Sequence, residues 1–132
     1  MIEGISHITL MVRDLDRTAK FLEAVFDAEE IYSSGDKTFS TAREKYFLIG
    51  GIWIAIMKSD CAPERTYDHI AFKIEEDDFE KYASKAIAAG ADIRPGRKRV
   101  DGEGRSLYFY DYDHHLFELH TGTLSERLDR YQ

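Results

Sequence analysis

The sequence predicts an α+β fold built from two βαβββ modules, and an internal repeat is the main observation behind this prediction. The stretches ISHITLMV and YDHIAFKI superimpose when the chain is shifted by 62 positions, which places His69 over His7. Both alternate between apolar and other side chains, as strands with two different faces do. The same shift aligns two further stretches, KYFLIGGIWIAIM and LYFYDYDHHLFELHT, that are typical of β-hairpins. We therefore expect one domain over 1–132, with modules at about 4–58 and 66–121.

An amphipathic helix is expected after the first strand of each module. Apolar residues recur at helical spacing within 14–26, and Asp14 or Asp16 is suited to cap the start of this helix. The corresponding helix of the second module is expected at about 77–89 and is closed by Gly90. Each module therefore supplies one helix to cover one face of its sheet.

The end of the chain is expected to form a third, short helix at about 123–131. Thr123 and Glu126 have the spacing of a capping box, in which the first side chain and the fourth satisfy each other's backbone N–H groups. The proline and glycines of 94–105 predict a loop before the second hairpin.

Composition and charge exclude several classes of function. Hydrophobic residues make up 43% of the 132 residues and charged residues 33%, which is enough apolar material for a core. The net charge of −7 argues against nucleic acid as a partner. No apolar run approaches the ~20 residues of a membrane span, so we expect no membrane partner and a cytoplasmic protein. Cys61 is the only cysteine, which excludes an internal disulfide.

Three residues on predicted strands could bind a metal ion. His7 and His69 occupy equivalent positions of the repeat, and Glu118 lies between Phe117 and Leu119 on a strand that otherwise belongs to a core. A carboxylate in such a place is costly unless it is paired or binds a metal. Two imidazoles and one carboxylate leave coordination positions open and suit Mn²⁺, Fe²⁺, Zn²⁺ or Co²⁺.

Other polar residues are placed by the same repeat. Under the shift of 62 positions, Glu118 falls over Ile56 and Ser106 falls over Glu44. His114 and His115 are expected at the surface of a hairpin turn, whereas His120 could donate a hydrogen bond to a metal ligand.

Four segments resemble the vicinal oxygen chelate superfamily and, within it, the fosfomycin resistance enzymes. They are ISHITL, RTYDHIAF, GEGRSLYFYD and HLFELHTGTLSERL, and the resemblance covers nearly the whole chain. It implies the vicinal oxygen chelate fold, with a cupped mixed sheet, and a homodimer whose chains exchange modules. It also implies Mn²⁺ as the metal, held by His7, His69 and Glu118.

The resemblance implies fosfomycin as the substrate and assigns its contacts. The residues that would clamp the phosphonate are Lys98, Ser106, Tyr108 and Arg127, and those that would shape the pocket around the epoxide are Thr9, Trp53 and Tyr67. Residues 94–105 form a cationic cluster suited to a small dianion. Within it, Arg94, Arg97 and Arg105 are expected to be solvated surface charges.

Glu44 separates the two reactions known in this family, addition of water and addition of a thiol. It alternates with Tyr46 and Leu48 on a predicted strand, so its carboxylate could face the metal or could be an exposed charge at the strand end. The resemblance to the water-adding enzymes implies that it is the general base for the attacking water. A thiol (glutathione) transferase and a drug-binding protein without catalysis are the alternative functions.

Overall fold

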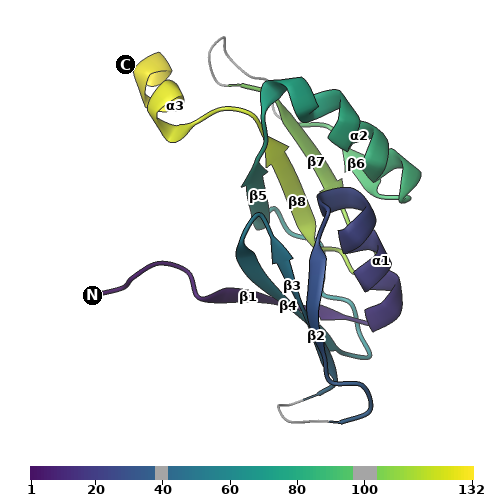
Figure 1. The fold of residues 1–132 in the computed structure, drawn as a ribbon. Helices are drawn as coiled ribbons and strands as arrows, with labels where there is room; N and C mark the ends of the chain where they lie inside the picture. Colours follow the sequence, from purple (N-terminus) through teal and green to yellow (C-terminus); the bar gives the residue numbers. More distant parts are fainter. Residues whose placement is uncertain (38–41, 97–103) are drawn as a thin grey trace. The chain divides into compact units, whose positions relative to one another are not determined.

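The computed structural model describes residues 1–37, 42–96 and 104–132, which form two compact units, 1–64 and 65–132. Each unit contains one four-stranded mixed sheet (Figure 1). This confirms the α+β class expected from the repeat. Within the described ranges, no helix has the length and apolar character needed to cross a membrane.

The first unit has the strand order β1-β4-β3-β2, in which β1 runs parallel to β4 and the other pairs are antiparallel. Figure 1 shows the helix α1 lying along one face of this sheet. The elements are β1 (His7–Val12), α1 (Leu15–Phe26), β2 (Glu29–Ser33), β3 (Glu44–Ile49) and β4 (Ile52–Lys58).

The second unit repeats this plan with the order β5-β8-β7-β6, where β5 runs parallel to β8. A short 3₁₀ turn precedes its helix α2, and a further helix follows the last strand. The elements are β5 (His69–Lys73), η1 (Glu76–Asp78), α2 (Phe79–Ala88), β6 (Asp92–Arg94), β7 (Ser106–Tyr110), β8 (Leu116–His120) and α3 (Leu124–Tyr131).

The register of the strands corrects one expectation from the repeat. Tyr46 pairs with Ala55 in the first sheet, and its counterpart Tyr108 pairs with Glu118 in the second. The last strands are therefore related by 63 positions rather than 62, so Glu118 corresponds to Ala55 and not to Ile56. The second hairpin has one residue more in its turn, and a shift of one residue moves a side chain to the other face of a strand. The equivalence of Glu44 and Ser106 is confirmed.

The two helix starts with cap signals form as the sequence predicts. Asp14, rather than Asp16, caps α1, because its carboxylate accepts from the backbone N–H of Arg17 at 3.0 Å. In α3, Thr123 and Glu126 make both hydrogen bonds of the capping box, which confirms that prediction.

The helix predicted at about 77–89 starts later than expected. Residues 76–78 form a 3₁₀ turn, and Asp78 makes no side-chain cap hydrogen bond. Short 3₁₀ turns are common at helix starts that lack a side-chain cap. The helix then ends at Ala88, two residues before Gly90, which has a φ of +79°.

Each sheet separates an apolar face from a polar one. In the first unit the apolar face and the inner stripe of α1 form the core, and each fully buried large side chain contributes ~1.5–3 kcal/mol. Its most buried members are Val12, Phe21, Leu22, Val25, Phe47, Ile54 and Ile56. In the second unit, Phe117 stacks with Phe72 and also contacts the ring of Phe109. The opposite face of each sheet carries the predicted metal ligands and the predicted catalytic residue.

Gly104 holds the start of β7 close to the segment after β8. Its φ is +83°, and a Cβ atom there would lie 2.6 Å from the backbone nitrogen of Gly122. The neighbouring Arg105 N–H donates to the hydroxyl of Thr121 at 2.8 Å. This close approach fixes the path of the chain toward α3.

The change Gly104→Ala should destabilise the protein more than Gly90→Ala. Both place a side chain at positive φ, which costs ~1–2 kcal/mol, but Gly90 has open space where the Cβ would lie. Only Gly104→Ala also forces the backbone of Gly122 to move. Thermal unfolding should show the larger decrease in Tm for Gly104→Ala, at roughly 3–6 °C per kcal/mol. Equal decreases would show that the close contact contributes nothing.

Candidate metal centre

One face of the second sheet gathers the polar residues singled out in the sequence. Glu118 lies between Ala71 of β5 and Tyr108 of β7, and His120 lies between Lys73 and Ser106. His69 is one step along the same face, paired with Leu116. The alternation of β8 sends Phe117 and Leu119 to the other side, where both are buried.

His69 and Glu118 face each other with ligand atoms in contact. The Nε2 atom of His69 lies 3.1 Å from Oε1 of Glu118. The Nδ1 atom of His69 lies 2.7 Å from the carbonyl oxygen of Tyr67, which can only accept, so Nδ1 carries a proton. In the neutral imidazole the lone pair of Nε2 then points at a carboxylate. A protonated imidazole could instead donate from Nε2 to the carboxylate, whereas the neutral form can share a cation with it.

The distance between these two atoms suits two ligands of one metal ion. Metal bonds of ~2.1 Å at a right angle separate the two ligand atoms by about 3.0 Å. An imidazole nitrogen and a carboxylate oxygen are also the donor types expected for Mn²⁺, Fe²⁺, Zn²⁺ or Co²⁺. The pair therefore fits a divalent metal.

Burial makes Glu118 dependent on its partners. Only 5% of the residue is exposed, and a charged carboxylate in such a place requires hydrogen bonds or a counter-charge. The hydroxyl of Ser106 donates to its Oε2 atom at 2.6 Å, a short charge-assisted hydrogen bond. His120 also lies near, with Nδ1 3.4 Å from Oε2.

His7, the third predicted ligand, belongs to the first unit. Its ring lies 4.1 Å from that of Trp53, and its Nδ1 atom lies 3.0 Å from the hydroxyl of Ser6. Over the described parts of the chain, no group of three or more His, Cys, Asp or Glu side chains is close enough to hold a metal. The structure thus brings together His69 and Glu118, and the role of His7 remains a prediction.

The face of the first sheet that carries His7 also carries Glu44. The register places residues of β1, β4 and β3 side by side in three rows across this face. The first row is His7, Trp53 and Leu48, and the second is Thr9, Ala55 and Tyr46. The third is Met11, Met57 and Glu44. Glu44 is buried, and its backbone N–H donates to the hydroxyl of Ser34 at 3.0 Å. Glu44 is therefore a buried residue with a fixed backbone, and it is not an exposed charge at the strand end.

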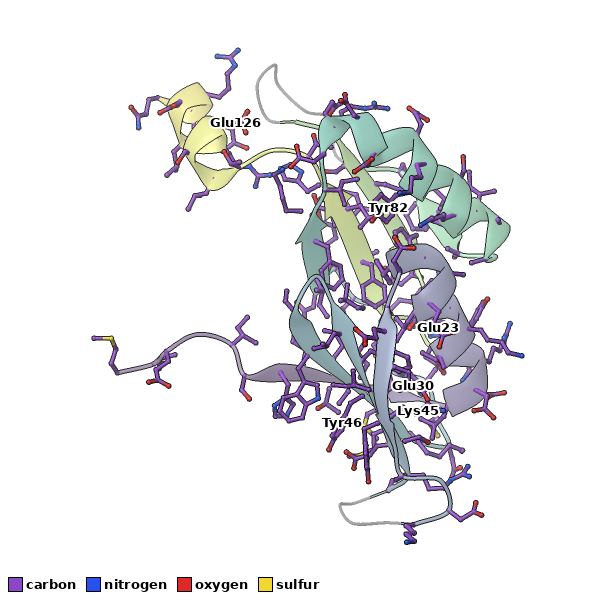
Figure 2. All side chains as sticks on the ribbon, viewed as in Figure 1. Glu23, Glu30, Lys45, Tyr46, Tyr82 and Glu126 are labelled. Carbon is purple, nitrogen blue, oxygen red and sulfur yellow. The ribbon has the colours of Figure 1, made fainter. Side chains whose placement is uncertain are left out.

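Glu44 also interacts with Tyr46, two residues along the strand. Figure 2 shows Tyr46 on the side of the sheet away from α1. A side-chain hydrogen bond to Glu44 is the main cause that raises the pKa of Tyr46, with smaller contributions from burial and from the charge of Glu44. The hydroxyl of Tyr46 thus stays protonated and donates to the carboxylate.

Three tyrosines line a small pocket beside His69, and two of them contact its ring. The hydroxyl of Tyr67 donates to that of Tyr108 at 3.3 Å, and both rings contact the ring of His69. The pocket has a volume of about 190 Å³, and it is lined by Tyr67, Arg94, Pro95, Tyr108, Tyr110 and Leu116.

Arg94 is exposed, as expected of a solvated surface charge. It also pairs with Tyr108 across the sheet and lines this pocket, which the sequence analysis did not predict. Its ion pair with one oxygen of Asp92 is long, at 3.8 Å, and Arg65 binds the other oxygen at 2.8 Å. The period-2 alternation of β6 with the adjacent strand is the signal that could have identified it.

The other predicted substrate contacts lie in different surroundings. Trp53 has a buried indole N–H that finds no hydrogen-bond partner within the described residues, and Thr9 is exposed. Ser106 and Arg127 contact the group around Glu118 and His120. Lys98, and Arg97 beside it, lie outside the described residues.

Arg105 is confirmed as a surface charge. Its guanidinium binds Glu76 at 3.1 Å and Glu80 at 2.8 Å, and it covers the ring of Phe79. These hydrogen bonds raise the pKa of Arg105, and that of Glu76 is lowered by hydrogen bonds from Thr121 and Arg105. His115, at the hairpin turn, is half-buried and bound to Asp111 at 2.8 Å, so it stabilises the turn.

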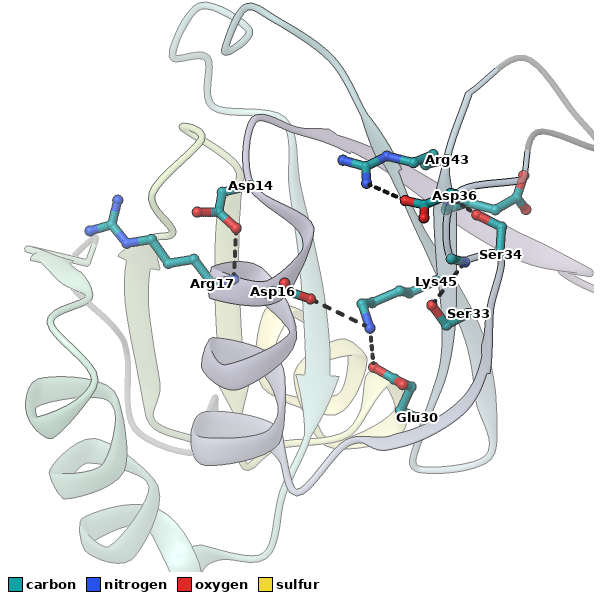
Figure 3. Close-up of polar contacts among 11 residues, drawn as sticks. Asp14, Asp16, Arg17, Glu30, Ser33, Ser34, Asp36, Arg43 and Lys45 are labelled. Carbon is teal, nitrogen blue, oxygen red and sulfur yellow. Dashed lines mark hydrogen bonds and ion pairs between the residues drawn. The ribbon is translucent and has the colours of Figure 1, made fainter.

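A larger hollow, of about 340 Å³, lies at the start of α1 in the first unit, and its charges are already paired. Lys45 binds Glu30 at 3.0 Å and lies 3.7 Å from Asp16, and Arg43 pairs with Asp36 (Figure 3). An anion in this hollow would have to displace these carboxylates. The pocket beside His69 is therefore the better candidate for substrate.

Two βαβββ units that carry imidazole and carboxylate groups on the polar faces of their sheets define a class of protein suited to bind a metal ion. Residues 4–119 match the family model of the Glyoxalase/Bleomycin resistance protein/Dioxygenase superfamily. The metallothiol transferase FosB of Shouchella clausii is 44% identical over 137 residues, covering 100% of this chain and 89% of that protein.

Relatives with a higher identity than this transferase are fosfomycin resistance proteins named FosX. The fosfomycin resistance protein FosX of Listeria innocua is 61% identical over 131 residues, covering 99% of this chain and 98% of that protein. A crystal structure of a FosX variant from Listeria monocytogenes, complexed with Mn(II) and 1S,2S-dihydroxypropylphosphonic acid, has a TM-score of 0.92 at 59% identity and covers 98% of this chain and 100% of that one. The chain therefore belongs to the Glyoxalase/Bleomycin resistance protein/Dioxygenase superfamily and, within it, to the FosX fosfomycin resistance proteins, which confirms the resemblance.

Replacing Glu44 should lower the pKa of Tyr46 toward the ordinary value of a tyrosine. The change Glu44→Ala removes both the hydrogen bond and the charge, whereas Glu44→Gln removes only the charge, so Ala should have the larger effect. The titration of ring-labelled tyrosine, assigned with Tyr46→Phe, measures this by NMR. An unchanged titration in both variants would contradict the contact.

The sign of the linked stability effect follows from the raised pKa. The contact stabilises the fold fully below the pKa of an unfolded tyrosine, and this contribution is lost as the pH rises through the pKa of Tyr46. The difference in stability between wild type and Glu44→Ala should therefore shrink in alkali.

Proposed function

We propose that this protein is a cytoplasmic, Mn²⁺-dependent epoxide hydrolase that adds water to fosfomycin and so confers resistance to it. The observation that carries the proposal is the buried carboxylate of Glu118 facing Nε2 of His69 at 3.1 Å. The complex of the related FosX variant with Mn(II) and a dihydroxypropylphosphonic acid supports the same metal and a diol product.

His69, Glu118 and His7 would hold the metal ion. A bound divalent ion acts as a Lewis acid, which offsets the negative charge that develops on the epoxide oxygen. The carbonyl of Tyr67 keeps His69 in the tautomer that has a lone pair on Nε2, and Ser106 holds the carboxylate of Glu118 in place.

Glu44 is the proposed general base. It takes a proton from a water molecule while the oxygen of that water forms a bond to one carbon of the epoxide ring. The bond between this carbon and the ring oxygen breaks, and a proton from the solvent converts the resulting alkoxide into the second hydroxyl of the diol. The row of Thr9 and Tyr46, between the rows of His7 and Glu44, is where substrate and water would lie.

The pocket beside His69 offers recognition groups for the phosphonate. Tyr67 and Tyr108 supply hydroxyls at its wall, and Arg94 supplies a cation with only a long ion pair. Lys98 and Arg127 remain predicted contacts. A homodimer with sites shared between chains also remains a prediction.

Two alternative functions are less well supported. A thiol transferase is favoured by the likeness to FosB, yet the identity to FosX is higher, 61% against 44%. A drug-binding protein without catalysis has no need of the predicted metal ligands His7, His69 and Glu118, and the diol complex of the related FosX variant also favours hydrolysis.

Phosphorus NMR distinguishes these functions in one experiment. Protein incubated with Mn²⁺ and fosfomycin, without any thiol, should convert the substrate signal into that of the diol. Chelation followed by dialysis should abolish the conversion, and added Mn²⁺ should restore it.

Three outcomes of this experiment would contradict the proposal. Conversion that requires a thiol would indicate a transferase, and tight binding of unchanged fosfomycin would indicate a binding protein. Turnover by protein shown to be metal-free by elemental analysis would exclude the metal mechanism.

The change Glu44→Gln should lower kcat by ~10²–10⁴-fold, the usual contribution of general-base catalysis. Mn²⁺ affinity and fosfomycin binding should stay close to wild type, because size and polarity are kept. Glu23→Gln, an exposed change on α1, is the matched control and should leave kcat unaltered. A Glu44→Gln enzyme with nearly wild-type kcat for diol formation would rule out the assigned role.

A further inference from the structure

A chain of three contacts links the metal ligand Glu118 to the helix α3. Ser106 Oγ lies 2.6 Å from Glu118 Oε2 and 2.8 Å from Nδ1 of His120. On the far side of the ring, Nε2 of His120 lies 3.4 Å from a guanidinium nitrogen of Arg127. Ser106 and His120 are cross-strand partners on β7 and β8, so the sheet register itself brings them together.

For a neutral His120, the donor and acceptor rules favour one arrangement of protons along these three contacts. Arg127 can only donate, so Nε2 of His120 must accept. A neutral imidazole that accepts at Nε2 carries its proton on Nδ1, which then donates to the hydroxyl oxygen of Ser106. The single hydroxyl proton of Ser106 is thereby directed to Glu118.

The opposite tautomer leaves two contacts unfavourable. If Nε2 of His120 carried the proton, it would face the N–H of Arg127. If the hydroxyl of Ser106 then donated to Nδ1, its lone pairs would face the carboxylate of Glu118 at 2.6 Å. Burial of Glu118 makes such a mismatch costly.

We propose that His120, held as the Nδ1–H tautomer, is a positioning residue that directs the hydroxyl of Ser106 onto Glu118 and so sets the affinity of the metal site. The inference rests on the proposed function only in taking Glu118 as a metal ligand. The proposal also changes the role expected for Ser106, because its single hydroxyl proton is donated to Glu118 and not to the phosphonate. Arg127, with five N–H groups, can serve both His120 and a substrate.

The helix α3 has a defined part in this arrangement. Its capping box, made by Thr123 and Glu126, fixes the first turn, and Arg127 is the next residue. Gly104 packs on the backbone of Gly122, which fixes the segment between β8 and α3. The C-terminal helix thereby orients a metal ligand that lies on the sheet.

Two substitutions of His120 with opposite geometry test the proposal. The amide of Asn places an N–H near the position of Nδ1, whereas the longer Gln places its amide near Nε2. His120→Asn should therefore retain Mn²⁺ affinity, and His120→Gln should weaken it by ~10–100-fold, the usual effect of losing a partner of a metal ligand. Ser106→Ala should weaken it to a similar degree, and Ser106→Thr should restore it.

Mn²⁺ affinity is measured by the EPR signal of the free ion, with His114→Asn as the matched control. His114 has a φ of +67°, a conformation that Asn adopts readily, and it lies in the turn away from Glu118. Thermal unfolding of each variant separates loss of affinity from loss of fold. Equal Mn²⁺ affinities for the Asn and Gln variants of His120 would overturn the proposal.

The tautomer is tested separately in metal-free wild-type protein. Long-range ¹H–¹⁵N NMR should show the proton of His120 on Nδ1, and a proton on Nε2 would overturn the proposal. This readout needs neither metal nor fosfomycin, so it distinguishes failure of this inference from failure of the proposed function. If the protein formed no diol, the inference would still hold provided that His120 carries its proton on Nδ1 and that His120→Asn binds Mn²⁺ more tightly than His120→Gln.

Discussion

The buried carboxylate of Glu118 is the constraint on which the functional part of the second unit depends. It lies on a strand whose neighbouring residues, Phe117 and Leu119, belong to the core, so water cannot solvate it freely. The hydroxyl of Ser106 donates to it, the rings of His69 and His120 lie beside it, and its charge suits it to bind a cation. The strand pairing of β5, β7 and β8 supplies all of these partners from one sheet face.

The two units use the same architecture for different chemistry. At equivalent positions of the sheets, Glu44 corresponds to Ser106 and Ala55 corresponds to Glu118. The first unit therefore places a carboxylate at the start of β3, where Tyr46 binds it, and the second places one in the middle of β8. A duplicated module can diverge in this way because each helix covers only the apolar face, which leaves the polar face free to change.

The cationic side chains of the two units differ in how closely carboxylates pair with them. Arg105, Lys45 and Arg43 are paired with carboxylates at the surface or in a hollow, where solvent and neighbouring acids satisfy them. Arg94 is also exposed, but its ion pair with Asp92 is long, at 3.8 Å, and its side chain lines an aromatic pocket. A cation in that position can attract a small dianion without first breaking a strong ion pair.

The sequence by itself determined the α+β class, the two modules, the cap of α3, and the equivalence of His7 and His69, because these follow from local periodicity and spacing. It could not determine the true counterpart of Glu118, because one extra residue in a turn reverses the face of a strand without changing the apolar pattern. The pairing of Ser106 with His120, and the place of Arg94 in a pocket, were also decided only by tertiary structure. Strand register brings together residues far apart in the chain, whereas local periodicity indicates only which face of its own strand a residue occupies.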